Sequence, residues 1–480
     1  MMRFVIVLLL LGCFFTASAQ PNPTAAADTN RIFTLDNLFE LIKEHHPIAR
    51  QSKLLTQQAA AQMLQARGGF DPQLYSYLDQ KTFDGKNYFT LAQNGFKIPT
   101  WYGIEVKGGY NINNGQFLNP ENKLPVQGQA VAGVSLTLIQ GLVIDQRRAA
   151  LKQARIFAQA NEAERQDMLN NLLFDAAAAY WEWALAYNQL LLQQQAVQLA
   201  QVRLEWVKNT FLQGARPAID TLEALIQLQN RQYDQNETEL QYQNTSLLLS
   251  TFLWADSDTP LEITNAITPP NFSNLALPSI NPDSVQLAFN RLSQIHPQLL
   301  LYQFKLSNLD VERRLKAEKL KPKLNLNYNL LANGLNFAAS ESPGNVNPFL
   351  QNYKWGLEFS MPLFLRAERG SLQLTRLKIQ EANLQLQQKQ WELQNKLQGY
   401  YNELLNNQRQ IALYRQTVNN YQALTEGEEF RFRFGESSLF LVNTRESKLL
   451  EAQGKLLELK AKHHKILAGI AFSGGTLFKQ

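Results

Sequence analysis

Cysteine is nearly absent from this chain, because Cys13 is the only one among its 480 residues. A single thiol excludes a disulfide framework and any metal site built from several cysteines. Histidine is scarce as well, with five residues, and no two of them have the H-x-x-x-H spacing of a helical zinc site. The composition therefore argues against a zinc enzyme and against a thiol enzyme.

Charged residues are also few, at 18% of the chain, and the net charge of +5 comes without a dense basic run. Nucleic-acid-binding domains concentrate their basic residues in a patch, so no nucleic acid partner is expected. The chain contains no G-x-S-x-G, no Walker-type loop and no nucleotide-binding glycine run. We therefore expect a protein that is not an enzyme, with no catalytic residue, no cofactor and no metal.

The N-terminus predicts export. Arg3 precedes the apolar run FVIVLLLLG, and the tripeptide ASA then fits a small-x-small cleavage site before Gln20. These features predict a secretory signal peptide at residues 1–19. Because LLLGC loosely resembles a lipobox, lipidation at Cys13 stays open as an alternative. After Gln20 no run reaches the ~18 apolar residues of a membrane-spanning helix, so the exported chain is either soluble or held in an outer membrane by strands.

A long internal repeat organises the chain. The dipeptide His-Pro at residues 46–47 recurs at 296–297, and Pro72 recurs as Pro322, both at an offset of 250 residues. A unit this long indicates a duplicated domain. The predicted units are a signal peptide (1–19), an N-terminal linker (20–34), a first repeat (35–256), a linker rich in Pro, Asn, Ser and Thr (257–282), a second repeat (283–470) and a C-terminal tail (471–480).

The two copies differ in length. Thr137 aligns with Ser360 at an offset of only 223 residues, so the first copy carries about 27 extra residues between Pro72 and Thr137. This excess leaves the number of strands in residues 72–139 open.

Alternating patterns predict β-strands between the opening helix and the long helices of each copy. Apolar residues alternate with polar or small ones over residues 104–107, 134–138, 324–330 and 355–361. A period of two places the apolar side chains on one face of each strand. Such strands fit an outer-membrane barrel, and they fit a half-buried sheet in a soluble protein equally well.

Two stretches predict very long helices. Residues 145–212 contain no proline or glycine, and residues 372–425 are interrupted only by Gly399. At ~1.5 Å per residue, the first would be roughly 100 Å long.

Both predicted helices carry two heptad series, displaced by two positions and hence roughly 200° apart around the helix. The first helix has Leu190, Val197, Leu204 and Phe211 in one series, and Leu185, Leu192, Leu199 and Trp206 in the other. The second helix has Leu377, Leu384 and Trp391 in one series, and Ile379, Leu386, Leu393 and Tyr400 in the other. A two-stranded coiled coil needs one seam, so two seams predict a neighbour on each flank, as in a closed ring of helices.

The order of signal peptide, broken helix, strands, long helix pair, linker and repetition resembles the TolC family of outer-membrane efflux and secretion ducts. The local motifs are SMPLF at 360–364, the weaker TLIQG at 137–141, and the helix-tip segments at 211–224 and 433–446. The resemblance covers nearly the whole chain after the signal peptide, although Ile139 replaces the proline of SMPLF in the first copy. It implies a mainly α fold with a membrane β-barrel, in which a homotrimer pools its strands into one outer-membrane β-barrel and its long helices form a periplasmic α-helical barrel.

The resemblance also implies a function, a location and partners. The protein would be the outer-membrane channel of a tripartite efflux or type I secretion system, a passive exit duct in the lipid of the bacterial outer membrane. It would dock onto a periplasmic adaptor protein and an inner-membrane pump of the RND or ABC type. The alternative is a soluble periplasmic coiled-coil scaffold without a pore. Neither the exported substrate nor the resting state of the tip follows from the sequence.

The candidate functional residues lie at two turns, where Gly214 and Gly435 permit the positive φ that a tight helix-to-helix turn needs. Asp220 and Glu223 follow the first turn, and three copies would form a carboxylate ring that favours cations. The alternative role is a helix start that Asp220 caps, with Glu223 at its third position. The further gate candidates, with arginines that could pair with them across protomers, are Glu426, Glu428, Glu429, Arg216, Arg431 and Arg433. The resemblance places adaptor docking at the exposed tips, with candidate residues Gly214, Ala215, Gly435, Ser437, Ser438 and Leu439.

Overall fold

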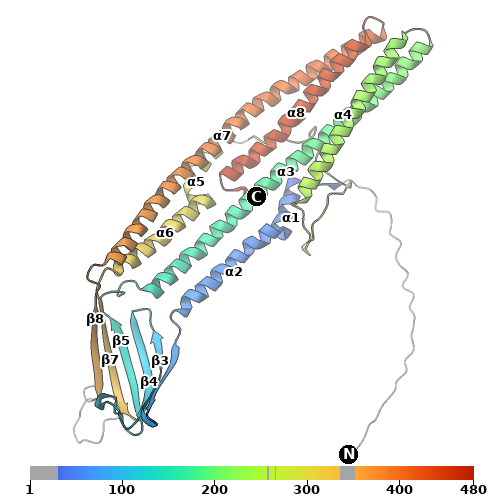
Figure 1. The fold of residues 1–480 in the computed structure, drawn as a ribbon. Coiled ribbons are helices and arrows are strands. Elements are labelled where there is room, and N and C mark those ends of the chain that lie inside the picture. The colour runs from blue at the N-terminus through green and yellow to red at the C-terminus, as the bar shows by residue number, and fades with distance from the viewer. Residues whose placement is uncertain (1–30, 257–258, 265, 280, 336–351, 480) are drawn as a thin grey trace, which may run out of the picture.

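The computed structural model of the protein describes residues 31–256, 259–264, 266–279, 281–335 and 352–479. A sheet lies at one end of the molecule, and long helices run from it to two turns at the opposite end (Figure 1). The predicted signal peptide and Cys13 lie outside the described residues. In the described ranges, no helix is apolar over a stretch long enough to cross a membrane.

Each half of the chain contributes a broken helix and two long helices. The helices of the first half are α1 (Leu35–His45), α2 (Pro47–Gly68), α3 (Gln146–Leu212) and α4 (Ala218–Ser250). Those of the second half are α5 (Pro282–Ile295), α6 (Pro297–Glu318), α7 (Arg366–Arg433) and α8 (Leu439–Ser473). Two short 3-10 helices are η1 (Pro120–Asn122) and η3 (Leu477–Lys479). With 67 and 68 residues, α3 and α7 confirm the prediction of helices roughly 100 Å long.

Both His-Pro pairs break the opening helix as predicted. The histidine ends one helix and caps the next, because its Nδ1 accepts a hydrogen bond from a backbone N–H two residues on. This bond is 3.2 Å from Ile48 to His46 and 3.3 Å from Gln298 to His296. The proline occupies the first helical position, where its missing N–H leaves no bond unmade. The repeated dipeptide is therefore a helix-capping device.

The sheet has six antiparallel strands in the order β2-β3-β4-β5-β7-β8. The strands are β2 (Gln73–Phe83), β3 (Lys86–Pro99), β4 (Ile104–Asn114), β5 (Gln129–Thr137), β7 (Lys323–Asn333) and β8 (Tyr353–Ser360). A separate two-stranded parallel pair joins β1 (Arg31–Ile32) to β6 (Ile267–Thr268) beside the helices. The first half of the chain thus supplies four strands of the large sheet, and the second half supplies two.

The register of the sheet sorts its side chains into an apolar face and a polar face. Leu136 pairs with Leu326, which pairs with Leu357, whereas the adjacent row on the other face includes Ser135 and Asn327. The charged strand residues on the polar face are Asp79, Lys81, Lys97, Glu105, Lys107, Lys323, Lys354 and Glu358. Of the charged strand residues, only Lys86 beside the β2–β3 turn falls on the apolar side. One face is therefore suited to lipid and the other to water.

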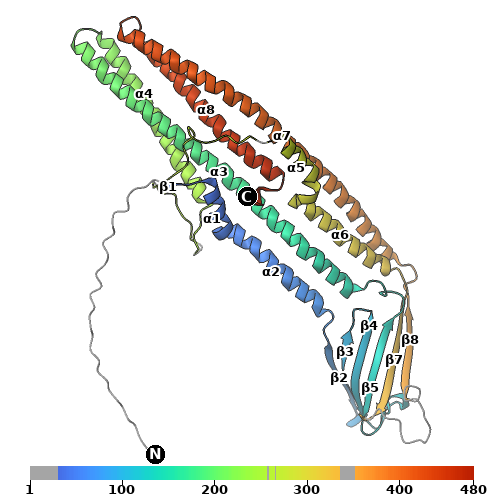
Figure 2. The same cartoon turned by 180° about the vertical axis from the view of Figure 1, so that it is seen from behind.

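The two halves pack together near the middle of the molecule. Near the sheet, α2, α3, α6 and α7 lie side by side, and further out the α3–α4 and α7–α8 hairpins run together (Figures 1 and 2). The central core contains Trp183 and Tyr180, and the Tyr180 hydroxyl donates to the Phe33 carbonyl at 2.8 Å. The connecting segment crosses here, where Lys460 of α8 donates to the Phe272 carbonyl at 2.8 Å.

The two predicted heptad series of each long helix have different environments. In α3, Leu204 is 4% exposed, whereas Leu199 of the other series is 59% exposed. In α7, Leu393 is 4% exposed, whereas Leu384 is 66% exposed. In α7 a single chain therefore packs one seam and leaves the other on its surface. In α3 the second seam is exposed only toward the tip, at Leu199 and Trp206, whereas Leu185 and Leu192 are half-buried.

Candidate functional site: the helical tip

The two tip turns have the same backbone geometry. Gly214 and Gly435 have φ values of 73° and 79°, which a residue with a Cβ adopts only with strain. After each glycine, a backbone N–H reaches back five residues, from Ala215 to the Thr210 carbonyl at 3.0 Å and from Glu436 to the Arg431 carbonyl at 2.9 Å. This bonding pattern satisfies the last carbonyls of α3 and α7 and reverses the chain.

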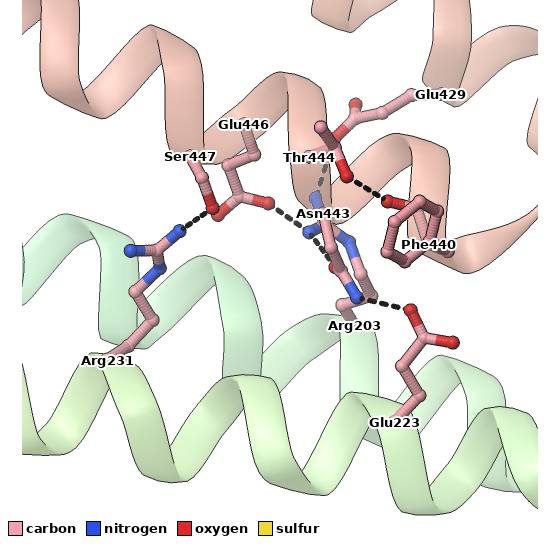
Figure 3. A network of polar contacts seen from close by, with 9 residues as sticks. All are labelled: Arg203, Glu223, Arg231, Glu429, Phe440, Asn443, Thr444, Glu446 and Ser447. Atoms are coloured by element: carbon pink, nitrogen blue, oxygen red, sulfur yellow. Dashed lines mark hydrogen bonds and ion pairs between the residues drawn. The ribbon is translucent and has the colours of Figure 1, made fainter.

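A polar network centred on Arg203 joins the two hairpins near the tip (Figure 3). Arg203 of α3 donates to Glu429 of α7 at 2.7 Å and forms an ion pair with Glu446 of α8. Asn443 of α8 accepts a bond from Arg203 at 3.4 Å and donates to Glu223 of α4 at 3.2 Å. All four long helices therefore meet in one set of hydrogen bonds.

A second cross-hairpin contact lies farther from the turns and a third lies at the turn itself. Arg231 of α4 donates to the Ser447 hydroxyl of α8 at 2.7 Å. Arg216, in the first turn, donates to the backbone carbonyl of Phe432 in α7 at 2.6 Å. Its guanidinium carbon also lies 3.7 Å from the centre of the Phe432 ring, a cation–π geometry. An apolar cluster that includes Leu204, Leu439 and Phe432 packs among these contacts.

The family described as outer membrane efflux protein matches residues 103–253 and 289–476, which is more than half of the chain. The chain belongs to this outer membrane efflux protein (TolC) family. A search of curated proteins gives no match.

Solved channels share the fold of this efflux protein. The outer-membrane channel OprN is 15% identical with a TM-score of 0.66, over 97% of this chain and 98% of OprN. The Campylobacter jejuni CmeC channel is 14% identical with a TM-score of 0.63, over 95% of this chain and 90% of CmeC. The open state of the Neisseria gonorrhoeae MtrE channel is 14% identical with a TM-score of 0.63, over 92% of this chain and 89% of MtrE.

The family fixes the class of protein. The chain is an outer membrane efflux channel with a periplasmic helical extension, and it is not an enzyme. The alternative of a soluble periplasmic scaffold is therefore wrong. The fold expectation of long helices joined to a curled β-sheet of an outer-membrane channel is confirmed.

The efflux protein does not use Asp220 as a helix cap. Helix α4 begins at Ala218 with Pro217 in the capping position, so Asp220 is the third helical residue. Its carboxylate lies 3.4 Å from Arg216 of the same chain. The capping interpretation is therefore wrong, because the cap position lies three residues earlier, at Pro217.

The other acidic candidates have different surroundings. Glu428 is buried and accepts a bond from the Ser437 hydroxyl at 2.5 Å, and Arg431 of the same helix lies 3.9 Å from it. Glu426 accepts a bond from Gln422 of its own helix at 3.1 Å. For Arg433, the described residues provide no ion-pair partner.

The tip of the efflux protein exposes more apolar surface than the docking candidates suggested. Gly214, Ala215 and Gly435 are exposed, but the Leu439 side chain is buried in the apolar cluster and cannot contact a partner. The exposed apolar side chains around the two turns include Leu212, Ile219, Phe434 and Phe440.

The sequence did not predict four residues of this network, Arg203, Arg231, Asn443 and Glu446. Arg203 lies next to Leu204 of the packed heptad series, and a charged residue beside a seam was the one local signal available. Its carboxylate partners are 226 and 243 residues away, so no spacing rule connects them.

Proposed function

We propose that this channel works as a homotrimeric passive exit duct in a tripartite efflux or type I secretion system. The observation that carries the proposal is the exposed heptad series on α7. Leu377, Leu384 and Trp391 are all more than half exposed in one chain, although they repeat every seven residues like a packed seam. A neighbouring copy would cover them and continue the ring of helices.

The sheet supports the same assembly. Strands β2 and β8 are its outermost members, and each has one neighbour. Inside a bilayer, an open sheet edge leaves backbone N–H and C=O groups without partners, which costs several kcal/mol per group. Pooling the strands of several copies removes these edges.

The tip network would hold the periplasmic end of the duct in one conformation. Arg203, Arg216 and Arg231 each bind the second hairpin from the first. Widening the tip would require the α3–α4 and α7–α8 hairpins to move apart and break these bonds. Asp220 and Glu223 would then contribute to a ring of carboxylates at the narrow end, which favours cations.

The exposed tip supports the proposed partners. A periplasmic adaptor would cover Leu212, Ile219, Phe434 and Phe440, because clustered exposed apolar side chains mark interaction sites. The energy for transport would come from an inner-membrane pump of the RND or ABC type, and the duct would be passive.

A charge placed on the exposed seam tests the assembly. The Leu384→Asp variant should lose the trimer in detergent extracts, measured by native mass spectrometry, because the aspartate would be desolvated at the interface. Asn383→Asp adds the same charge at an exposed position about 100° around the helix and should assemble normally. A stable Leu384→Asp trimer would contradict the proposed ring.

A further inference from the structure

The extra residues of the first repeat form one β-hairpin. Pro72 and Pro322 immediately precede β2 and β7, and Thr137 and Ser360 end β5 and β8. Strand β2 therefore corresponds to β7, and β5 corresponds to β8. Between β2 and β5 lie β3 and β4, which have no counterpart among the described residues of the second repeat, 283–335 and 352–479. The basic unit is thus a pair of strands, and the first copy has doubled it.

This hairpin is a continuous part of the sheet. It pairs with β2 from Gln73 to Phe83 on one side and with β5 along eight residues of β4 on the other. The inserted strands continue the apolar face with Phe96 and Val106, and the polar face with Lys97 and Lys107. A hairpin that lay outside the sheet, as a flap or a plug, would not need to continue its apolar and polar faces in register.

Close packing holds both the strands of the hairpin and the turn that joins them. A Cβ on Gly108 would lie 2.4 Å from the Phe96 ring, so a side chain there would have to displace that ring. The turn between β3 and β4 is held against the end of α2, where the Trp101 ring stacks on Phe70 with centroids 4.1 Å apart. The strands and their turn are therefore built for this position.

We infer that the hairpin enlarges the outer-membrane barrel, so that the β2 edge of one copy pairs with the β8 edge of the next and three copies close eighteen strands. This inference rests on the proposed trimeric duct. The occupant of each edge is a second copy of this chain, because only a pairing strand satisfies the backbone groups of an edge in lipid. Without β3 and β4, the same closure would contain twelve strands.

The consequence is a wider exit. With strands about 4.8 Å apart and tilted by about 40°, eighteen strands give a backbone diameter of roughly 36 Å, and twelve give roughly 24 Å. Barrels of 16–18 strands leave an aqueous channel, and here its wall would carry the polar face with Lys97, Lys107 and Lys354. The outer section would therefore pass bulkier cargo than a barrel built from the basic unit.

Single cysteines test whether the hairpin lies in the wall. Cys13 is the only natural cysteine, so Val106→Cys and Lys107→Cys can be labelled with a charged maleimide on the full-length protein in proteoliposomes. We expect Lys107→Cys to react at least ten times faster than Val106→Cys, because one side chain faces water and the other faces lipid. Equal labelling of the two would overturn the inference.

A second pair of cysteines separates this inference from the proposed duct. Leu326→Cys and Asn327→Cys occupy the same two faces of β7, which belongs to the basic unit. If this pair discriminates and the hairpin pair does not, the barrel exists without the hairpin. If neither pair discriminates, the duct itself fails.

Electron microscopy of the wild-type trimer supplies a direct strand count. Eighteen strands in the membrane section would support the inference. A trimer closed by twelve strands, with β3 and β4 displaced, would overturn it while leaving the duct intact. A closed assembly of another number of copies would overturn both.

Discussion

Arg203 of α3 and Glu446 of α8 form an ion pair across 243 residues of sequence, and the Glu446 side chain is only 5% exposed. Arg203 also binds Glu429 of α7, so one guanidinium connects the first hairpin to both helices of the second. Charges interact more strongly in such a partly desolvated place than at a surface. Removing one partner leaves the other charge buried and unpaired. The distance between the two helical hairpins therefore depends on the single side chain of Arg203.

Arg203→Ala should therefore loosen the tip. The change leaves Glu446 unpaired at a cost of about 3 kcal/mol, which favours separation of the hairpins. We expect a higher single-channel conductance in planar bilayers. Lys208→Ala removes the exposed partner of Glu205 on the same helix and should change nothing measurable. Equal conductance of Arg203→Ala and wild type would show that the network does not restrain the tip.

The double variant Asp220→Ala with Glu223→Ala should weaken cation selectivity and raise conductance. Three copies lose six carboxylates near the first turn, while Arg216 keeps its positive charge. The reversal potential across a KCl gradient measures the selectivity. Glu239→Ala removes an exposed carboxylate farther along α4 and serves as the control. An unchanged reversal potential would leave these two residues with only their bonds to Arg216 and Asn443.

Leu326→Arg should block insertion into the outer membrane. An arginine on the lipid face costs roughly 2–4 kcal/mol at the bilayer midplane, and Leu326 lies in the apolar row between Leu136 and Leu357. Membrane fractionation and native gels follow insertion and assembly. Asn327→Arg places the same group on the polar face and should be tolerated. Normal fractionation of Leu326→Arg would mean that β7 does not face lipid.

Acidification should destabilise the break between α5 and α6. Burial, together with Lys389 and Lys396, lowers the pKa of His296 from its usual 6.5 to about 4. The unfolded chain then binds more protons than the folded one between these values, so stability is full above pH 6.5 and falls as pH drops toward 4. The loss is roughly 3 kcal/mol per chain, because the protonated ring would carry its charge in a buried place close to Lys389 and Lys396.

Urea unfolding at pH 7, 5 and 4 measures this effect. His296→Asn keeps a good capping acceptor and removes the titration, so its stability should fall less over the same range. Parallel pH profiles for the variant and the wild type would exclude His296 as the cause.

Features that depend on neighbours along the chain were predictable from the residues alone. Seven-residue spacing and the lack of proline predicted α3 and α7, and alternation predicted four of the six strands of the large sheet. The His-Pro dipeptides predicted the helix breaks, because a proline ring acts on its own turn. The glycine turns were predictable for the same reason, since a positive φ is a property of a single residue.

Features that depend on residues far apart in the sequence became visible with the tertiary structure. The structure shows which heptad series packs within the chain and that Leu439 is buried. It also shows that β3 and β4 lie between β2 and β5. It also brought Arg203 to carboxylates more than 220 residues away. Periodicity fixes which side of a helix is apolar, but the identity of the neighbour on that side follows from how the helices pack, which no local pattern encodes.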